Sequence, residues 1–128
     1  KDLEVYDPDT WRPYCHVEDF ANLLLLALET PENKISFEVF NVGMDNNNFT
    51  KRMIVEKIQE FIPTKRVYFV NKPGTDPRNY RVNFSKLKEQ LGYQCQFSVE
   101  DGIKEIINQL ENNIEDKNDQ LGNYQVRL

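Results

Sequence analysis

The chain has 128 residues, 39% of them hydrophobic and 29% charged, which is typical of one globular domain with a single core. Its net charge of −5 argues against non-specific nucleic-acid binding, because neutralising phosphates requires a basic surface. The longest apolar run, Leu23–Leu28, is far too short to cross a membrane.

The first third of the chain predicts one helix between two extended segments. In chain order we expect a loop over residues 1–8, an extended segment Trp11–Tyr14, a helix His16–Glu29 and a strand Phe37–Val42. Pro13 disfavours helical geometry at Arg12, which is why the second segment should be extended. The helix is apolar nearly all round, and such helices are usually buried on more than one side.

The remainder predicts three further helices and one strand. The helices are Thr50–Phe61, the short Phe84–Leu91 and Val99–Asn113, and the strand is Lys65–Asn71. Polar loops are expected over Asp45–Asn48 and Lys72–Arg81. Thr50 or Asn48 can cap the first of these helices, and Ser98 with Asp101 resembles a capping box before the last. The alternation of helices and strands indicates an α/β fold with too few strands for a complete doubly wound sheet.

The chain contains two cysteines and one histidine, residue types that can act as nucleophiles or metal ligands. Cys15 and Cys95 match no metal-binding spacing, so we expect no metal and two reduced thiols in a cytoplasmic protein. A disulfide between them stays open. A catalytic pair of Cys15 with His16 is disfavoured because neighbouring side chains in an extended segment diverge. We expect His16 to be a structural residue, hydrogen-bonded near the helix start.

Several short motifs occur in a family-specific order. They are Arg12-Pro13-Tyr14-Cys15-His16-Val17-Glu18-Asp19, Glu38-Val39-Phe40-Asn41-Val42-Gly43, Asn48-Phe49-Thr50, Lys72-Pro73-Gly74-Thr75-Asp76-Pro77-Arg78-Asn79-Tyr80, Asn83-Phe84-Ser85-Lys86, Leu91-Gly92-Tyr93 and Val99-Glu100-Asp101-Gly102-Ile103. Together they resemble the C-terminal part of the NAD-dependent epimerase/dehydratase family, the extended short-chain dehydrogenase/reductases that act on nucleotide sugars.

The resemblance implies a fold, and it implies that substrate binding and catalysis belong to different domains. Residues 1–114 would form a small mixed α/β substrate-binding domain with few strands, and residues 115–128 a polar tail. The strand Phe37–Val42 and the helix His16–Glu29 would complete a missing N-terminal Rossmann domain that binds NAD. We expect that domain to carry the glycine-rich loop and the catalytic Tyr-x-x-x-Lys pair, so that no catalytic residue lies in this fragment and it is inactive alone.

The resemblance also implies a site for a nucleoside diphosphate sugar. Arg12, Arg78, Tyr80 and Lys72 fall on the positions expected to hold the ligand. Arginine suits this role because its planar fork donates paired, charge-assisted hydrogen bonds to a pyrophosphate, whereas lysine offers a point charge. Without the surrounding motifs, the simpler interpretation of Arg12 is an ion pair with Glu18 or Asp19.

Two functional classes therefore remain. One is the substrate-binding part of an epimerase, an isomerase, or of a dehydratase, a lyase. The other is a stand-alone, non-catalytic module that binds a ligand or a protein with the same fold. In either case we expect the apolar helix and strand to be covered by another copy of the chain or to be visibly exposed.

Overall fold

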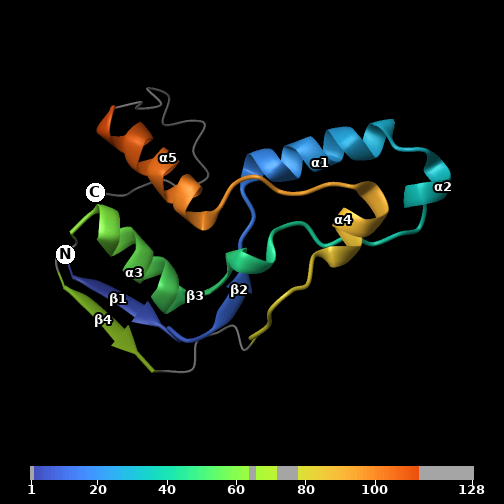
Figure 1. Cartoon of the computed structure of the whole chain (residues 1–128). Helices are drawn as coiled ribbons and strands as arrows, with labels where there is room; N and C mark the ends of the chain where they lie inside the picture. The colour runs from blue at the N-terminus through green and yellow to red at the C-terminus, as the bar shows by residue number, and fades with distance from the viewer. Residues whose placement is uncertain (1, 64–65, 72–77, 113–128) are drawn as a thin grey trace, which may run out of the picture.

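A computed structural model describes residues 2–63, 66–71 and 78–112 (Figure 1). The elements in chain order are β1 (Leu3–Tyr6), β2 (Trp11–Pro13), α1 (Val17–Glu29), α2 (Glu32–Ile35), a 3-10 turn (Asp45–Asn47), β3 (Asn48–Thr50), α3 (Lys51–Phe61), β4 (Val67–Val70), α4 (Ser85–Leu91) and α5 (Val99–Glu111). The fold is mixed α/β with few strands, as the sequence predicts. The predicted boundary between residues 114 and 115 lies outside the described residues.

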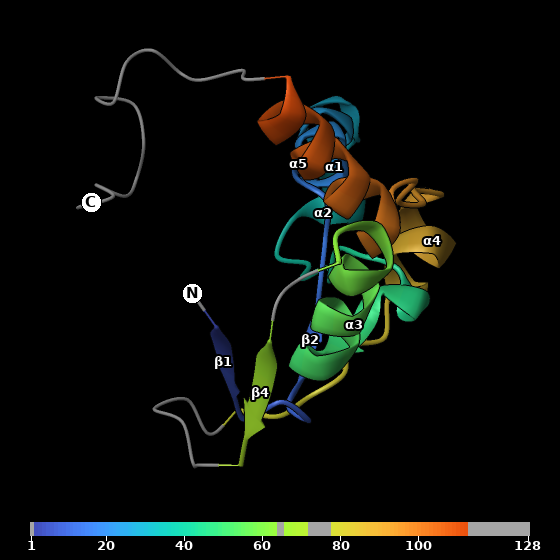
Figure 2. The ribbon, with the colours of Figure 1, turned by 90° about the vertical axis from the view of Figure 1, so that its left-hand side faces the viewer.

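The strands described form two small sheets. β1 pairs in parallel with β4, and Figure 2 shows the two strands side by side at one edge of the molecule. β2 pairs antiparallel with β3, which places Arg12 opposite Phe49. The prediction of a strand within Lys65–Asn71 is confirmed, but the loop expected over residues 1–8 is wrong. Four residues that pair with a segment far along the chain leave little local signal.

Residues 37–42 do not form the predicted strand. Phe37 has a backbone φ of 59° and a fully exposed side chain, and Val39 is 79% exposed. A strand needs a neighbour to satisfy its backbone N–H and C=O groups, and the described part of the chain pairs none with this segment. The predicted buried strand is therefore wrong for the described residues, in which Phe37 and Val39 face solvent.

Helix α1 forms as predicted, yet most of its apolar surface is exposed. Within it only Asp19 and Leu23 are buried. Leu25 is 61% exposed and Leu28 is 85% exposed. Figure 1 shows α1 along the outer edge of the molecule, with α4 near its far end. Burial on more than one side is therefore not achieved within the described residues, and the expected exposed apolar surface is present.

The core is small and is completed by buried amides. Its buried apolar side chains are Leu23, Phe84, Leu87 and Cys95. Asn47 accepts a hydrogen bond from the backbone N–H of Val99 (3.1 Å), and Asn48 accepts one from that of Val82 (2.9 Å). These bonds fix the turn before β3 to the segments that precede α5 and α4. β2, which pairs with β3, is thereby held in the centre of the fold.

Two of the predicted helix starts, those of α3 and α5, are confirmed by their caps. Thr50 accepts a hydrogen bond from the N–H of Met53 at 3.2 Å. Ser98 and Asp101 form the reciprocal capping box at the start of α5. Helix α4 begins at Ser85, one residue later than predicted, and its N-cap Phe84 makes no side-chain cap bond; the backbone and hydroxyl of Ser85 donate instead to Asn83 Oδ1. These local contacts explain why the helix boundaries were readable from sequence.

Candidate functional site

Strand β2 lies against residues 79–81, a segment far away in the sequence. The N–H of Trp11 donates to Asn79 Oδ1 at 2.9 Å, and the N–H of Tyr80 donates to the Trp11 carbonyl oxygen at 3.5 Å. These bonds run in both directions between the two segments. The residues on either side of Trp11 and Asn79 are consequently held close together.

Arg12 is half-buried and lies beside Tyr80. Its Nη1 donates to the Trp11 carbonyl oxygen at 2.7 Å, and its guanidinium carbon lies 5.3 Å from the centroid of the Tyr80 ring. This separation is within the range of a cation–π interaction. Burial raises the pKa of the neighbouring Tyr14 hydroxyl, while the charge of Arg12 acts in the opposite direction. The structure thus brings together two residues that the sequence predicts for one site.

Arg81 is a cationic neighbour that the sequence analysis missed. Its guanidinium carbon lies 4.6 Å from the centroid of the Trp11 ring. Each segment therefore places a cation over an aromatic ring of the other. Arg12 of β2 lies over Tyr80, and Arg81 lies over Trp11 of β2. The only sequence signal was its place directly after Tyr80 in the same motif.

For the other two predicted ligand residues, Arg78 and Lys72, the structure gives less detail. Arg78 is exposed and directly precedes Asn79, the residue that accepts the hydrogen bond from β2. Its backbone therefore lies beside the strand that carries Arg12. Lys72 lies outside the described residues.

The spacing Tyr-x-x-x-Lys does occur in the chain, at Tyr68 and Lys72, so the expectation that it would be absent is wrong. Tyr68, however, belongs to strand β4 and is 45% exposed. Residues four apart lie next to each other on a helix, but about 13 Å apart along a strand. Tyr68 therefore does not lie on a helix, the setting in which that spacing brings two side chains together, and Lys72 lies outside the described residues.

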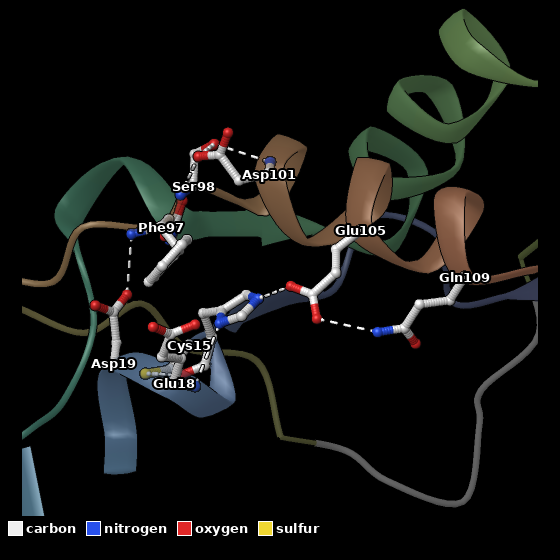
Figure 3. A network of polar contacts seen from close by, with 10 residues as sticks. Cys15, Glu18, Asp19, Phe97, Ser98, Asp101, Glu105 and Gln109 are labelled. Atoms are coloured by element: carbon white, nitrogen blue, oxygen red, sulfur yellow. Dashed lines mark hydrogen bonds and ion pairs between the residues drawn. The ribbon is translucent and has the colours of Figure 1, made fainter. Parts of the chain in front are cut away.

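His16 belongs to a structural network at the start of α1, and its partners Glu18, Phe97 and Glu105 are labelled in Figure 3. Its Nδ1 accepts a hydrogen bond from the Glu18 N–H at 3.2 Å, its Nε2 lies 2.9 Å from Glu105 Oε2, and its ring stacks on Phe97 with centroids 4.5 Å apart. The Cys15 thiol donates to the backbone oxygen of His16 rather than to the ring. The expectation of a histidine hydrogen-bonded near the helix start is confirmed.

Asp19 ties α1 to the segment before α5. Its carboxylate is buried and accepts the N–H groups of Gln96 at 2.8 Å and Phe97 at 3.0 Å, the second of which is drawn in Figure 3. The Tyr93 hydroxyl donates to the Asp19 carbonyl oxygen at 2.6 Å. The alternative of an Arg12–Asp19 ion pair has no support here, because both carboxylate oxygens of Asp19 bind backbone.

A hollow of about 400 Å³ separates the start of α1 from α3 and α5. Its walls are mainly apolar and include Tyr14, Ile54 and Ile106, with His16 and Glu105 at its side. Arg12 and Tyr80 do not line it. The predicted ligand residues instead lie on the β2 surface. Among the described residues, no cluster of His, Cys, Asp and Glu could hold a metal ion.

Comparisons with known proteins agree with the motifs. A sequence model of the NAD dependent epimerase/dehydratase family matches residues 2–43. The UDP-glucuronate 4-epimerase of Thermodesulfobacterium geofontis is 24% identical over 117 residues, which cover 90% of this chain. The dTDP-glucose 4,6-dehydratase of Shigella flexneri is 29% identical over 117 residues and covers 84%.

These likenesses agree with the resemblance of the motifs to the NAD-dependent epimerase/dehydratase family. The chain's structure resembles that of a UDP-glucose 4-epimerase from Thermotoga maritima, solved with UDP-glucose, with a TM-score of 0.74 and 25% identity over 90% of this chain. A dTDP-glucose 4,6-dehydratase from Bacillus anthracis, solved in complex with NAD, gives a TM-score of 0.68 and 26% identity over 88%.

The chain spans only about a third of these relatives. It covers 35% of the Thermodesulfobacterium epimerase and 36% of the Thermotoga structure. The family model covers β1, β2, α1 and α2, and so includes Arg12 but neither Arg78 nor Tyr80. In the described part of the chain, no helix has the length and apolarity needed to cross a membrane.

Proposed function

We propose that the chain is the substrate-binding part of an NAD-dependent nucleotide-sugar epimerase or dehydratase, and that Arg12 holds the nucleoside diphosphate. The observation that carries this proposal is the placement of Arg12 against Tyr80, on two segments that are hydrogen-bonded to each other. Relatives named for UDP-glucose, UDP-glucuronate and dTDP-glucose support the class of ligand.

The local chemistry suits a diphosphate. Arg12 is partly buried and its guanidinium is oriented by the Trp11 carbonyl and the Tyr80 ring, so little side-chain freedom remains to be lost when a ligand binds. A guanidinium has five N–H donors and meets phosphate oxygens in pairs. We assign Arg78 and Lys72 as further positive charges for the same ligand, and the Tyr80 hydroxyl as a hydrogen-bonding group.

The redox chemistry lies elsewhere in the parent enzyme in this proposal. NAD, when bound, accepts and returns a hydride. The 128 residues contain no Gly-x-x-Gly-x-x-Gly loop, the feature that brings a helix N-terminus up to a dinucleotide pyrophosphate. The chain's own contribution is to bind and orient the sugar nucleotide, and we propose that it has no turnover alone.

The same proposal assigns a partner to the exposed apolar surface of α1 and the segment around Val39. Leu24, Leu25 and Leu28 are exposed on α1, and Val39 is exposed in the apolar segment that lacks a strand partner. Burying one leucine contributes about 1.5–3 kcal/mol, so this surface is expected to be covered in the working protein. We assign it as the face that meets the dinucleotide-binding domain. A second copy of the chain is the alternative occupant, and light scattering distinguishes a homo-oligomer from a monomer.

A cytoplasmic location belongs to this proposal as well. Nucleotide-sugar chemistry does not require an oxidising compartment, and both cysteines are free in the structure. Free thiols of this kind are typical of reducing compartments.

Replacing Arg12 by alanine tests the binding role. In the natural protein that contains these residues, Arg12→Ala should weaken binding of UDP-glucose or dTDP-glucose by about 1–3 kcal/mol, the usual cost of a lost charged hydrogen bond. Isothermal titration calorimetry measures this change. Arg66→Ala removes the same charge from an exposed position just before β4 and should leave affinity unchanged. Equal affinity of Arg12→Ala and the unmodified protein would refute the assignment.

A further inference from the structure

Three consecutive residues each hold a different part of Trp11. Asn79 Oδ1 accepts the Trp11 N–H at 2.9 Å, and the Tyr80 N–H donates to the Trp11 carbonyl oxygen at 3.5 Å. The guanidinium carbon of Arg81 lies 4.6 Å from the centroid of the indole ring. Trp11 is therefore fixed both at its backbone and at its side chain by one short segment that is distant in sequence.

Trp11 in turn orients the side chain of Arg12. The Trp11 carbonyl oxygen accepts a hydrogen bond from Arg12 Nη1 at 2.7 Å. The guanidinium thus folds back onto the peptide group that precedes it in the strand, and its direction depends on the position of that peptide. A shift of β2 away from residues 79–81 would carry the carbonyl oxygen away from the Tyr80 ring, and the guanidinium with it.

The two cation–aromatic pairs lie on opposite faces of β2. Successive side chains of a strand point to opposite faces, so the Trp11 ring and the Arg12 side chain leave β2 in opposite directions. Arg81 lies over the ring of the first, and Tyr80 lies beside the guanidinium of the second. A ligand held by Arg12 and Tyr80 therefore meets the face of β2 that the Trp11–Arg81 pair does not occupy.

We propose that Trp11 and Arg81 are positioning residues for the nucleoside diphosphate site, which hold Arg12 in the orientation that meets the ligand and do not contact the ligand themselves. This inference rests on the proposed function, because it takes the ligand of Arg12 to be a nucleoside diphosphate sugar. Arg81 fixes the indole ring, and the ring helps to fix the Trp11 peptide against residues 79–81. The Trp11 carbonyl oxygen then fixes the guanidinium. Affinity for the ligand therefore depends on a contact on the other face of the strand.

The test is a double-mutant cycle on the natural protein that contains these residues, with binding of UDP-glucose and dTDP-glucose measured by isothermal titration calorimetry. Arg81 is exposed, so Arg81→Ala should fold, and it should weaken binding about 2- to 5-fold, the equivalent of one exposed cation–π contact. In the Arg12→Ala background the same change should have no further effect, because no guanidinium is left to position. A residue that touches the ligand, or one that acts only on overall stability, would instead weaken binding equally in both backgrounds.

Variants of Trp11 separate positioning from charge. Trp11→Leu removes the aromatic face without changing the net charge, and it should weaken binding about as much as Arg81→Ala. Trp11→Phe keeps a ring beneath the guanidinium and should restore most of the affinity. Lys104→Ala is the matched control, because Lys104 of α5 also lies over a ring, that of Phe61 in α3, at 5.3 Å from its centroid. This control removes one positive charge and one cation–π contact away from β2 and should leave affinity unchanged.

Two results would overturn the inference while leaving the proposed function intact. In the first, Arg12→Ala weakens binding but Arg81→Ala and Trp11→Leu do not. In the second, Arg81→Ala weakens binding to the same extent with and without Arg12, which would make Arg81 a ligand contact or a source of long-range attraction. Unchanged affinity of Arg12→Ala would be a different failure, because it refutes the proposed function and the inference with it.

Discussion

Replacing Asp19 by alanine is expected to lower the free energy of unfolding by about 3 kcal/mol. The carboxylate is only 1% exposed and accepts the N–H groups of both Gln96 and Phe97. Alanine leaves these two donors without an acceptor, and each buried unsatisfied donor costs about 1–3 kcal/mol. The loss should also loosen residues 93–97 from α1.

Two further variants separate this role from a general effect of negative charge at a helix start. Asp19→Asn keeps one acceptor oxygen and should lose about half as much stability. Glu18→Ala removes an exposed carboxylate from the same helical turn and should cost under about 1 kcal/mol, the size of a helix-dipole contribution. Chemical denaturation measures all three. Equal losses for Asp19→Ala and Glu18→Ala would show that the backbone bonds do not matter.

Replacing Gly43 by alanine is expected to destabilise the chain by about 3 kcal/mol, through overpacking and backbone strain together. A Cβ atom at Gly43 would lie 2.7 Å from Cζ of Phe84, far inside van der Waals contact. Phe84 is buried and has little room to move away. Gly43 also has a φ of 150°, a backbone conformation that side-chain-bearing residues rarely adopt.

Gly92 provides the matched control. It has a φ of 67° at the end of α4, but a Cβ there meets no atom within 4 Å. Gly92→Ala should therefore carry the conformational cost alone, about 1 kcal/mol. Thermal or urea unfolding of both variants measures the difference. A Gly43→Ala variant no less stable than Gly92→Ala would mean that Phe84 moves aside freely.

The helices could be predicted from sequence because their signals are local. The Ser98–Asp101 capping box and the Thr50 cap lie within one turn of the helices they start. The strands were harder, since pairing depends on segments far apart. The sequence predicts a loop where β1 forms, because its partner β4 is distant, and it predicts a strand over residues 37–42, although the described residues pair nothing with them.

In the candidate site, too, residues within motifs could be predicted from sequence, whereas contacts between distant segments could not. Arg12 and Tyr80 were found through ordered motifs, and the structure places them together. The contact of Arg81 with Trp11 has no local pattern and became visible only when β2 and residues 79–81 were seen side by side.

Turnover assays on the 128-residue chain and on the natural protein that contains it test the proposed function most directly. Each would be supplied with NAD and with UDP-glucose, UDP-glucuronate or dTDP-glucose, and the products would be followed by chromatography. A substrate-binding part without its own cofactor site should give no product and no NAD binding, whereas the natural protein should convert one of the three sugars. Measurable conversion by the 128 residues alone would contradict this account.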